Sequence, residues 1–240
     1  MDKLDVLGCP CMALTEDQVA QQITSIVNSS ESGYSVAINA EKIWEYCKGG
    51  DFKKIVDASI FPYPDGAGAV LGLKWLHGAL SEKVNMPLLS LEVANDSKMR
   101  TYIIGASEVN HDLAIDNIKA RYRNIQLVGN MHGYHSKERM VKGIISAKPQ
   151  LILLALGSPR QEILAAELVA TCNFGFFVGC GGALDILSGV TRRAPKYMVD
   201  NNLEWLYRLY KQPLRARRQI FLPLFLIKLV CRAMKNRFLA

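Results

Sequence analysis

The stretch from Leu151 to Gly189 constrains the fold of this chain more than any other. It opens with six consecutive apolar residues, Leu151 to Leu156, a length typical of a buried strand. A Gly-Ser-Pro turn and a helical stretch follow. A second apolar run, Phe174 to Val178, then ends in a glycine-rich turn before another helical stretch. This order of strand, turn, helix, strand, turn and helix predicts two parallel strands of an α/β sheet.

Both predicted turns follow the carboxyl ends of their strands, so they lie at the same edge of the sheet. Ligands of α/β proteins bind at this edge. Glycines let backbone N–H groups approach a ligand, and each following helix directs its positive end there, which favours phosphate. The spacing is not G-x-G-x-x-G, so a dinucleotide fingerprint is absent. The residues alone predict an anion-binding edge, although Gln161 and Glu162 also suit solvated helix starts.

A third strand end lies near the amino terminus. Residues 34–38 are apolar enough for a short strand that ends at Asn39, and the helical stretch 40–46 follows. Lys42 then lies in the first turn of that helix, where a cation suits a carboxylate on a ligand. On the pattern alone, the simpler interpretation is a helix cap for Asn39 and a surface charge for Lys42.

A fourth candidate is Asp65. A short apolar piece, residues 59–61, leads into Pro62-Tyr63-Pro64-Asp65-Gly66. Two prolines fix the backbone and the glycine permits a tight turn, so the pattern predicts a stiff loop that displays the Asp65 carboxylate. An ordinary turn residue is the simpler alternative.

The same alternation of strands and helices recurs through the rest of the chain. The predicted elements are helices at 15–28, 68–80 and 108–121, strands at 101–104 and 125–128, and a turn at 129–134. We therefore expect residues 1–195 to form a Rossmann-like, mostly parallel sheet with helices on both faces.

The carboxyl-terminal segment differs in charge from the rest. The chain has a net charge of +7, yet residues 192–240 hold twelve Lys or Arg and two acidic residues, which leaves seventeen basic and twenty acidic residues before them. The apolar run 220–227 is far shorter than the roughly 20 residues that span a bilayer. We expect residues 196–240 to be a basic amphipathic appendage that docks on an anionic membrane. Nucleic acid would favour aromatic stacking platforms or base-reading residues, and neither is evident. Packing on a partner subunit is the other alternative.

Other features point to a cytoplasmic protein on the inner face of the cell membrane. The amino terminus lacks the basic start and long apolar core of a signal peptide. The six cysteines have no metal-binding or redox spacing and suit reduced thiols. No Asp-x-Asp motif is present, and His132 and His135 lack a ligand partner at metal-binding spacing, so we expect neither a metal nor a cofactor.

Several separated blocks of the chain resemble the WecG/TagA/CpsF glycosyltransferases. The blocks are residues 38–42, 63–66, 157–162, 181–185, 192–195 and 203–209. They occur in the family's order and cover residues 35 to 220. Members are bacterial enzymes that move a sugar from a UDP-sugar to a polyprenyl-diphosphate-linked acceptor.

The resemblance implies an inverting transferase that acts in cell-surface polysaccharide synthesis. Within the family, the Asn-Ala-Glu-Lys block is most similar to enzymes of enterobacterial common antigen synthesis. The implied donor is UDP-N-acetylmannosaminuronate, or a related N-acetylhexosamine, and the implied acceptor is N-acetylglucosamine on polyprenyl diphosphate. One alternative is a different UDP-hexose for capsule or exopolysaccharide. A more distant one is a nucleotide-binding, non-catalytic membrane adaptor. A homo-oligomer is a further expectation.

The resemblance also implies the roles of individual residues. Asp65 is the expected catalytic base and Asn39 lies in the active pocket. Expected substrate-binding residues are Lys42, Lys83, Tyr134, Gly157, Ser158, Gln161, Glu162, Gly181, Gly182, Asp185, Arg215, Arg217 and Arg218. The chain departs from the family in two places. Lys83 begins Lys-Val-Asn-Met where the family has an Arg-Val-Pro-Gly-like stretch, and His135 replaces a phenylalanine after Gly133-Tyr134.

Overall fold

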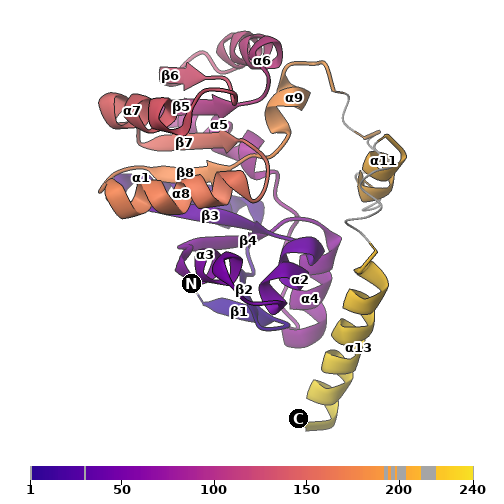
Figure 1. Cartoon of the computed structure of the whole chain (residues 1–240). Helices are drawn as coiled ribbons and strands as arrows, with labels where there is room; N and C mark the ends of the chain where they lie inside the picture. The colour runs from indigo at the N-terminus through magenta and orange to yellow at the C-terminus, as the bar shows by residue number, and fades with distance from the viewer. Residues whose placement is uncertain are drawn as a thin grey trace.

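A six-stranded parallel sheet forms the centre of the protein, in the order β4-β3-β8-β7-β5-β6 (Figure 1). The structure is a computed structural model that describes residues 2–29, 31–191, 194–195, 198, 204–211 and 220–239. The strands are β3 (Gly33–Ile38), β4 (Phe61–Pro64), β5 (Arg100–Gly105), β6 (Gln126–Met131), β7 (Leu151–Ala155) and β8 (Phe176–Gly179). The predicted parallel α/β sheet is confirmed.

Helices cover both faces of this sheet because successive strand residues point to opposite sides. Leu151 and Leu153 belong to one buried cluster, whereas Ile152 and Leu154 belong to the other. The first cluster includes residues of α1 (Glu16–Ser29), α5 (Met86–Asp96), α6 (Glu108–Arg121) and α9 (Ala183–Leu187). The second includes residues of α2 (Ala40–Cys47), α3 (Asp51–Ala58), α4 (Ala67–His77), α7 (Lys137–Ala147) and α8 (Arg160–Thr171).

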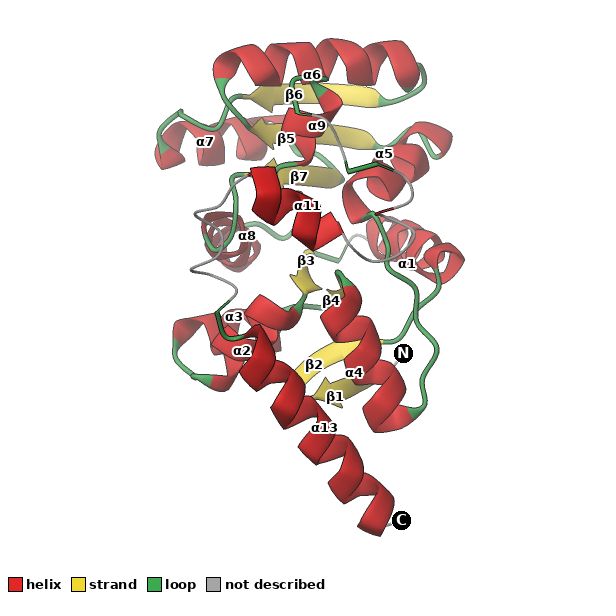
Figure 2. Ribbon diagram, turned by 90° about the vertical axis from the view of Figure 1, so that its right-hand side faces the viewer, coloured by secondary structure: helices red, strands yellow, loops and turns green. Residues whose placement is uncertain are grey.

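Two elements extend the second face. The antiparallel hairpin of β1 (Lys3–Val6) and β2 (Cys9–Met12) contributes Val6, Cys9 and Cys11 to the same cluster. Helix α13 (Leu222–Leu239) packs against α2 and α4 and extends away from the sheet towards the carboxyl terminus (Figure 2). A further helix, α11 (Glu204–Lys211), lies between the sheet domain and α13 in the sequence.

The expectation of a loop from Pro62 to Gly66 is wrong for its first half. Pro62 to Pro64 belong to β4, which pairs with β3, and the turn begins only at Asp65. Because β4 is the edge strand, its prolines need not donate to a neighbour on the outer side.

The expected turn at 129–134 also begins later, because β6 continues to Met131 instead of ending at residue 128. Gly129 pairs with Tyr102 of β5. A Cβ atom at Gly129 would lie 2.3 Å from Cε2 of that tyrosine ring. The glycine therefore marks a close approach within a strand and not its end.

Helix α13 buries one face and exposes the other. Phe221, Phe225 and Leu229 are buried in the second cluster. The Phe221 ring stacks on Trp44 of α2 with a centroid distance of 5.5 Å, and Lys228 Nζ lies 4.5 Å from the centroid of the same tryptophan ring. The exposed large apolar residues of α13 are Leu224, Leu226, Ile227, Val230 and Met234. Within the described ranges, no helix has both the length and the apolar character needed to cross a membrane.

Candidate active site

Four adjacent strands bring the predicted residues to one edge of the sheet. In the order β4-β3-β8-β7, the strand ends carry Asp65, Asn39, the turn 180–182 and the turn 156–159. Because these strands are parallel and roughly 5 Å apart, residues from four distant blocks of sequence meet along a short edge. The predicted convergence of the turns after β7 and β8 is confirmed.

Asn39 is the N-cap of α2, because its Oδ1 accepts a hydrogen bond from the Lys42 backbone N–H at 3.0 Å. Asp65 is fixed beside it, since its backbone N–H donates to the carbonyl oxygen of Ile38 at 2.7 Å. The Asp65 side chain is half-buried. Within the part of the chain that the structure describes, no side chain hydrogen-bonds to the Asp65 carboxylate.

Tyr63 lies just before Asp65 and is 2% exposed. Its pKa is raised well above the ordinary value, first by burial and then by the neighbouring Asp65 and Glu162 carboxylates. The phenol therefore stays neutral. The sequence pattern did not identify Tyr63, because its position resembled an ordinary strand residue.

A buried ion pair joins the β3 and β7 ends. Lys42 Nζ lies 2.6 Å from Glu162 Oε1, and the two side chains are 9% and 1% exposed. Gln161 Nε2 donates to the same Oε1 at 3.1 Å. Helix α8 begins after Pro159, which has no backbone N–H, so Glu162 cannot return to cap the helix as a glutamate at its third position often does. The alternative of solvated helix-start residues is therefore wrong for Gln161 and Glu162.

Gln161 also holds the turn after β8. Its Oε1 accepts a hydrogen bond from the Gly181 backbone N–H at 2.9 Å. Gly179 makes this possible, because a Cβ atom there would lie only 2.4 Å from Gln161 Nε2. One buried side chain thus links the two glycine turns that the sequence predicted to bind an anion.

Asp185 lies in α9 and is oriented by α6. Asn110 Nδ2 donates to Asp185 Oδ1 at 2.8 Å, across 75 residues of sequence. The sequence did not indicate Asn110, because an asparagine three residues after the helix cap Ser107 is an ordinary helix-start residue. Gly182, next to this helix, is exposed and open to a ligand.

Gly157 and Ser158 form the turn between β7 and α8. Gly157 has a φ of +76°, in the left-handed region that favours glycine, and Ser158 is exposed. Both therefore present backbone and hydroxyl groups at the same edge as Gln161.

Tyr134 follows β6, at the far end of the sheet from Asp65. The residue is 79% exposed. The Gly133 backbone N–H donates to the Ala106 carbonyl oxygen at 2.8 Å, so the β6 turn folds back over the end of β5. An exposed aromatic ring on such a turn is available for stacking.

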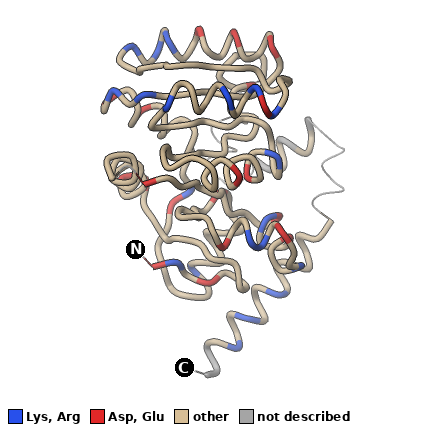
Figure 3. Tube along the Cα trace, turned by 60° about the vertical axis from the view of Figure 1, so that its left-hand side comes forward, with Lys and Arg blue, Asp and Glu red and all other residues tan. Residues whose placement is uncertain are grey.

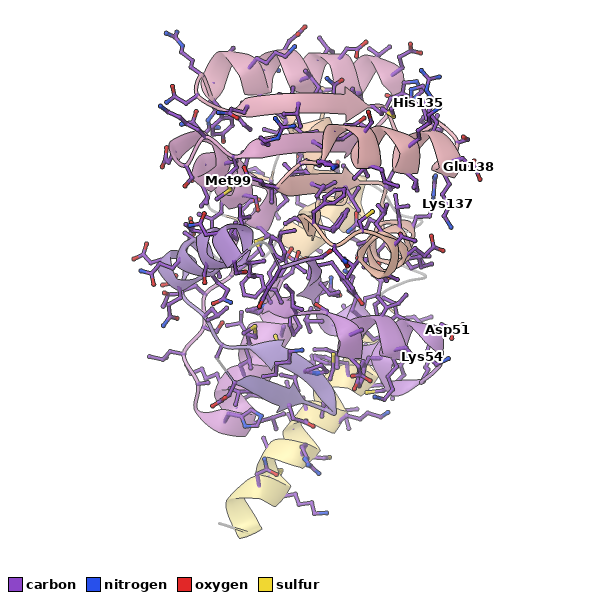
Figure 4. The ribbon with its side chains drawn as sticks, turned by 90° about the vertical axis from the view of Figure 1, so that its left-hand side faces the viewer. Asp51, Lys54, Met99, His135, Lys137 and Glu138 are labelled. Atoms are coloured by element: carbon purple, nitrogen blue, oxygen red, sulfur yellow. The ribbon has the colours of Figure 1, made fainter. Side chains whose placement is uncertain are left out.

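The histidines of this turn contact each other. The rings of His132 and His135 stack with a centroid distance of 3.9 Å, and His135 lies beside the start of α7 with Lys137 and Glu138 (Figure 4). The pKa of His135 is lowered, first by partial desolvation and then by the charge of His132. Over the described ranges, no three His, Cys, Asp or Glu side chains gather as metal ligands.

The remaining predicted residues contribute less to this geometry. Lys83 is half-buried in the connection from α4 to α5, where the neighbouring Glu82 backbone N–H donates to Leu14 O at 3.0 Å. Arg215, Arg217 and Arg218 lie outside the described residues.

Comparison with known proteins agrees with this arrangement. The sequence profile described as "Glycosyl transferase WecG/TagA/CpsF family" matches residues 4–238. The N-acetylglucosaminyldiphosphoundecaprenol N-acetyl-beta-D-mannosaminyltransferase of Bacillus subtilis (strain 168) is 28% identical over 228 residues, which cover 93% of this chain and 86% of the relative. A protein of the same name from Bacillus spizizenii (strain ATCC 23059 / NRRL B-14472 / W23) is 29% identical over 221 residues, which cover 86% of this chain and 85% of the relative. With almost its whole length matched, this chain belongs to the WecG/TagA/CpsF family of glycosyl transferases.

Proposed function

We propose that this enzyme moves an N-acetylmannosamine-type sugar from UDP to N-acetylglucosamine on a polyprenyl diphosphate. The observation that carries the proposal is the convergence of Asp65, Asn39 and the two glycine turns at four neighbouring strand ends. The names of the two Bacillus relatives support the sugar and the acceptor. A role in enterobacterial common antigen synthesis stays a prediction, as do other hexose donors.

Asp65 is the proposed base of a single-displacement reaction. A hydroxyl oxygen of the acceptor attacks the anomeric carbon, its proton passes to the Asp65 carboxylate, and the bond to UDP breaks with its electrons on the diphosphate. A positioned carboxylate suits this role because a sugar hydroxyl is a poor nucleophile until its proton is accepted. The half-buried Asp65 has no competing side-chain donor among the described residues.

The leaving diphosphate is proposed to bind between the glycine turns. Gly157, Ser158, Gly181 and Gly182 offer small or polar groups at this edge, and Gln161 ties the two turns together. Helix α8 directs its positive end there, which stabilises negative charge.

Further groups are proposed to hold the nucleoside and balance charge. Asp185, oriented by Asn110, is proposed to bind the nucleoside, and Tyr134 to stack on the uracil. Lys83 and the three arginines at 215, 217 and 218 are proposed to neutralise the departing UDP. Cationic side chains from the carboxyl-terminal segment would neutralise the charge of the leaving diphosphate, as metal ions often do in such reactions.

The proposal is tested by incubating the purified full chain with UDP-N-acetylmannosamine and a short polyprenyl-diphosphate N-acetylglucosamine. UDP should form only when both substrates are present, together with an acceptor heavier by one sugar in mass spectrometry. UDP-glucose serves as a control donor. Absence of product with every UDP-sugar, despite UDP binding, would favour the non-catalytic adaptor instead.

We also propose that α13 docks the enzyme on an anionic membrane surface. Its described exposed face combines apolar residues with basic ones, and Figure 3 shows basic and no acidic positions along it. The basic residues of this helix are Lys228, Arg232, Lys235 and Arg237. The apolar strip and clustered cations together suit an interfacial segment.

The double change Arg232→Glu and Lys235→Glu should weaken binding to anionic vesicles at least about thirtyfold, because each cation near such a surface contributes about 1 kcal/mol. Both side chains lie away from the residues that pack α13 on α2 and α4, so the fold should persist. Vesicle co-sedimentation measures the effect, and Lys119→Glu with Lys148→Glu is the matched control. If the double variant sediments with vesicles as the wild type does, and salt does not weaken wild-type binding, docking through these cations is contradicted. If the double variant instead changes the oligomer mass in solution, this face of α13 is a subunit interface.

A further inference from the structure

The turn after β6 packs closely on the ends of two neighbouring strands. The Gly133 backbone N–H donates to the Ala106 carbonyl oxygen at 2.8 Å. A Cβ atom at Gly133 would lie 3.1 Å from that oxygen and 3.2 Å from Cδ2 of Leu156, the residue before the Gly157 turn. The turn that carries Tyr134 therefore lies against the β5 and β7 ends, beside the edge proposed to bind the donor.

His132 holds this turn through one ring nitrogen. Its Nδ1 accepts a hydrogen bond from the Tyr134 backbone N–H at 3.2 Å. Because a backbone N–H can only donate, Nδ1 must be unprotonated for this bond to form. The geometry resembles an Asx turn, in which a side-chain oxygen of asparagine or aspartate binds the N–H group two residues later. Protonation of His132 at Nδ1 therefore removes the acceptor that holds Tyr134.

His135 makes a positive charge on this pair unfavourable. Its ring stacks on that of His132 with a centroid distance of 3.9 Å and an interplanar angle of 25°, so two imidazolium charges would repel each other. The pKa of His135 is lowered, first by desolvation and then by the charges of His132 and Arg139. The more distant His111 lowers it further, whereas Glu108 raises it. The stacked arrangement is therefore most stable when both rings are neutral.

The other charged groups near the pair are already balanced or enclosed. Lys137 and Glu138 begin α7 beside His135 and carry opposite charges (Figure 4). Lys137 also forms an ion pair with Glu167 of α8. His111 on α6 is 2% exposed, and its Nδ1 lies 2.9 Å from the Gly105 carbonyl oxygen. In contrast, both stacked histidines are only half-buried, so protons from solvent reach them directly.

We propose that the stacked pair of His132 and His135 is a pH-sensitive positioning unit, which holds Tyr134 ready to stack on the uracil of the donor at neutral pH and releases it in acid. The proposal rests on the function proposed above and adds a regulation of the same site. The two histidines act through the position of Tyr134 and do not touch the reacting atoms.

The sign of the effect follows from the lowered pKa of His135. The folded turn favours the neutral ring, so the stacked arrangement has its full stability above the ordinary histidine pKa of about 6.5. As the pH falls below that value, an opened turn takes up protons that the stacked pair resists, and the stacked arrangement loses stability until the lowered pKa is passed. Donor binding should therefore weaken in acid.

The test measures binding of UDP-N-acetylmannosamine to the full chain by isothermal titration calorimetry at about pH 7.5 and about pH 5.5, on either side of the ordinary histidine pKa. This donor has no terminal phosphate that would take up a proton in that range, so its own charge stays constant. The wild-type Kd should rise by about three- to tenfold in acid, the effect of one hydrogen bond. An equal Kd under both conditions would overturn the proposal.

Two substitutions at position 132 separate the hydrogen bond from general effects of acid. His132→Asn offers an oxygen to the same N–H and does not titrate, so it should bind the donor as the wild type does at neutral pH and lose most of the pH dependence. His132→Phe keeps a ring to stack on His135 but has no acceptor, so its Kd at neutral pH should be about three- to tenfold higher. A full pH response in His132→Asn would contradict the proposal.

The matched control is His77→Asn. His77 is an exposed histidine at the end of α4, where its Nε2 lies 2.6 Å from the Asp5 carbonyl oxygen, and it belongs to neither the β6 turn nor the strand ends of the site. This variant should keep the full pH response of donor binding. If it loses that response, the titrating group is not the stacked pair.

NMR of the free enzyme distinguishes this proposal from the proposed function. In the wild type, the Tyr134 amide proton should move upfield on acidification because its hydrogen bond is lost, whereas in His132→Asn it should stay in place. An unchanged Tyr134 amide in the wild type would overturn the positioning role whether or not the donor binds. If the amide moves but the donor does not bind at neutral pH, the proposed function is refuted while the pH-sensitive turn is supported.

Discussion

Replacing Asp65 by asparagine should lower turnover by roughly 10²- to 10⁴-fold, the usual contribution of a positioned general base. The amide has nearly the same shape but cannot take the proton of the acceptor hydroxyl. The backbone hydrogen bond from Asp65 to Ile38 does not involve the side chain, so the turn should persist. UDP affinity should change little, because the carboxylate is proposed to act on the acceptor and not on the nucleotide.

Steady-state rates and UDP titration on the same preparation separate these effects. Asp51→Asn is the matched control, because Asp51 is exposed on α3 and pairs with Lys54 on the surface (Figure 4). Turnover of Asp65→Asn within a few-fold of wild type would remove Asp65 as the base.

Replacing Lys42 by methionine should lower the free energy of unfolding by about 3–5 kcal/mol, because it leaves the Glu162 carboxylate buried without its cation. The double variant Lys42→Met with Glu162→Leu should regain most of that loss, since two well-packed apolar side chains leave no buried charge. Urea denaturation monitored by circular dichroism measures both values.

The surface provides the contrast for this prediction. Lys54→Met breaks the exposed pair with Asp51 and should cost less than about 1 kcal/mol. Equal losses for Lys42→Met and Lys54→Met would show that the interior pair is not a buried charge interaction.

The sequence was sufficient for the elements whose signals are local. Apolar runs ended by glycine turns predicted β7 and β8 and their shared edge. The helix expected at 15–28 is α1 (Glu16–Ser29), and Thr15 and Gln18 cap it reciprocally. The position of Asn39 after its strand followed from the same kind of pattern.

What the sequence could not show are pairings between distant residues. Lys42 and Glu162 are 120 residues apart, and either alone resembles a surface charge. Asn110 meets Asp185 only because α6 packs against α9. The two prolines of β4 were misjudged because a local pattern does not tell an edge strand, where proline is tolerated, from a loop.

The anomeric configuration of the product tests the central claim most directly. A single displacement with Asp65 as base inverts the anomeric centre, so an α-linked UDP-N-acetylmannosamine donor gives a β-linked product. Proton NMR of the product formed by the purified full chain should therefore show a β-linked sugar, and Asp65→Asn should slow its formation without changing the linkage. An α-linked product would mean that the configuration is retained, which an in-line single displacement with Asp65 as base cannot give, and would contradict the account.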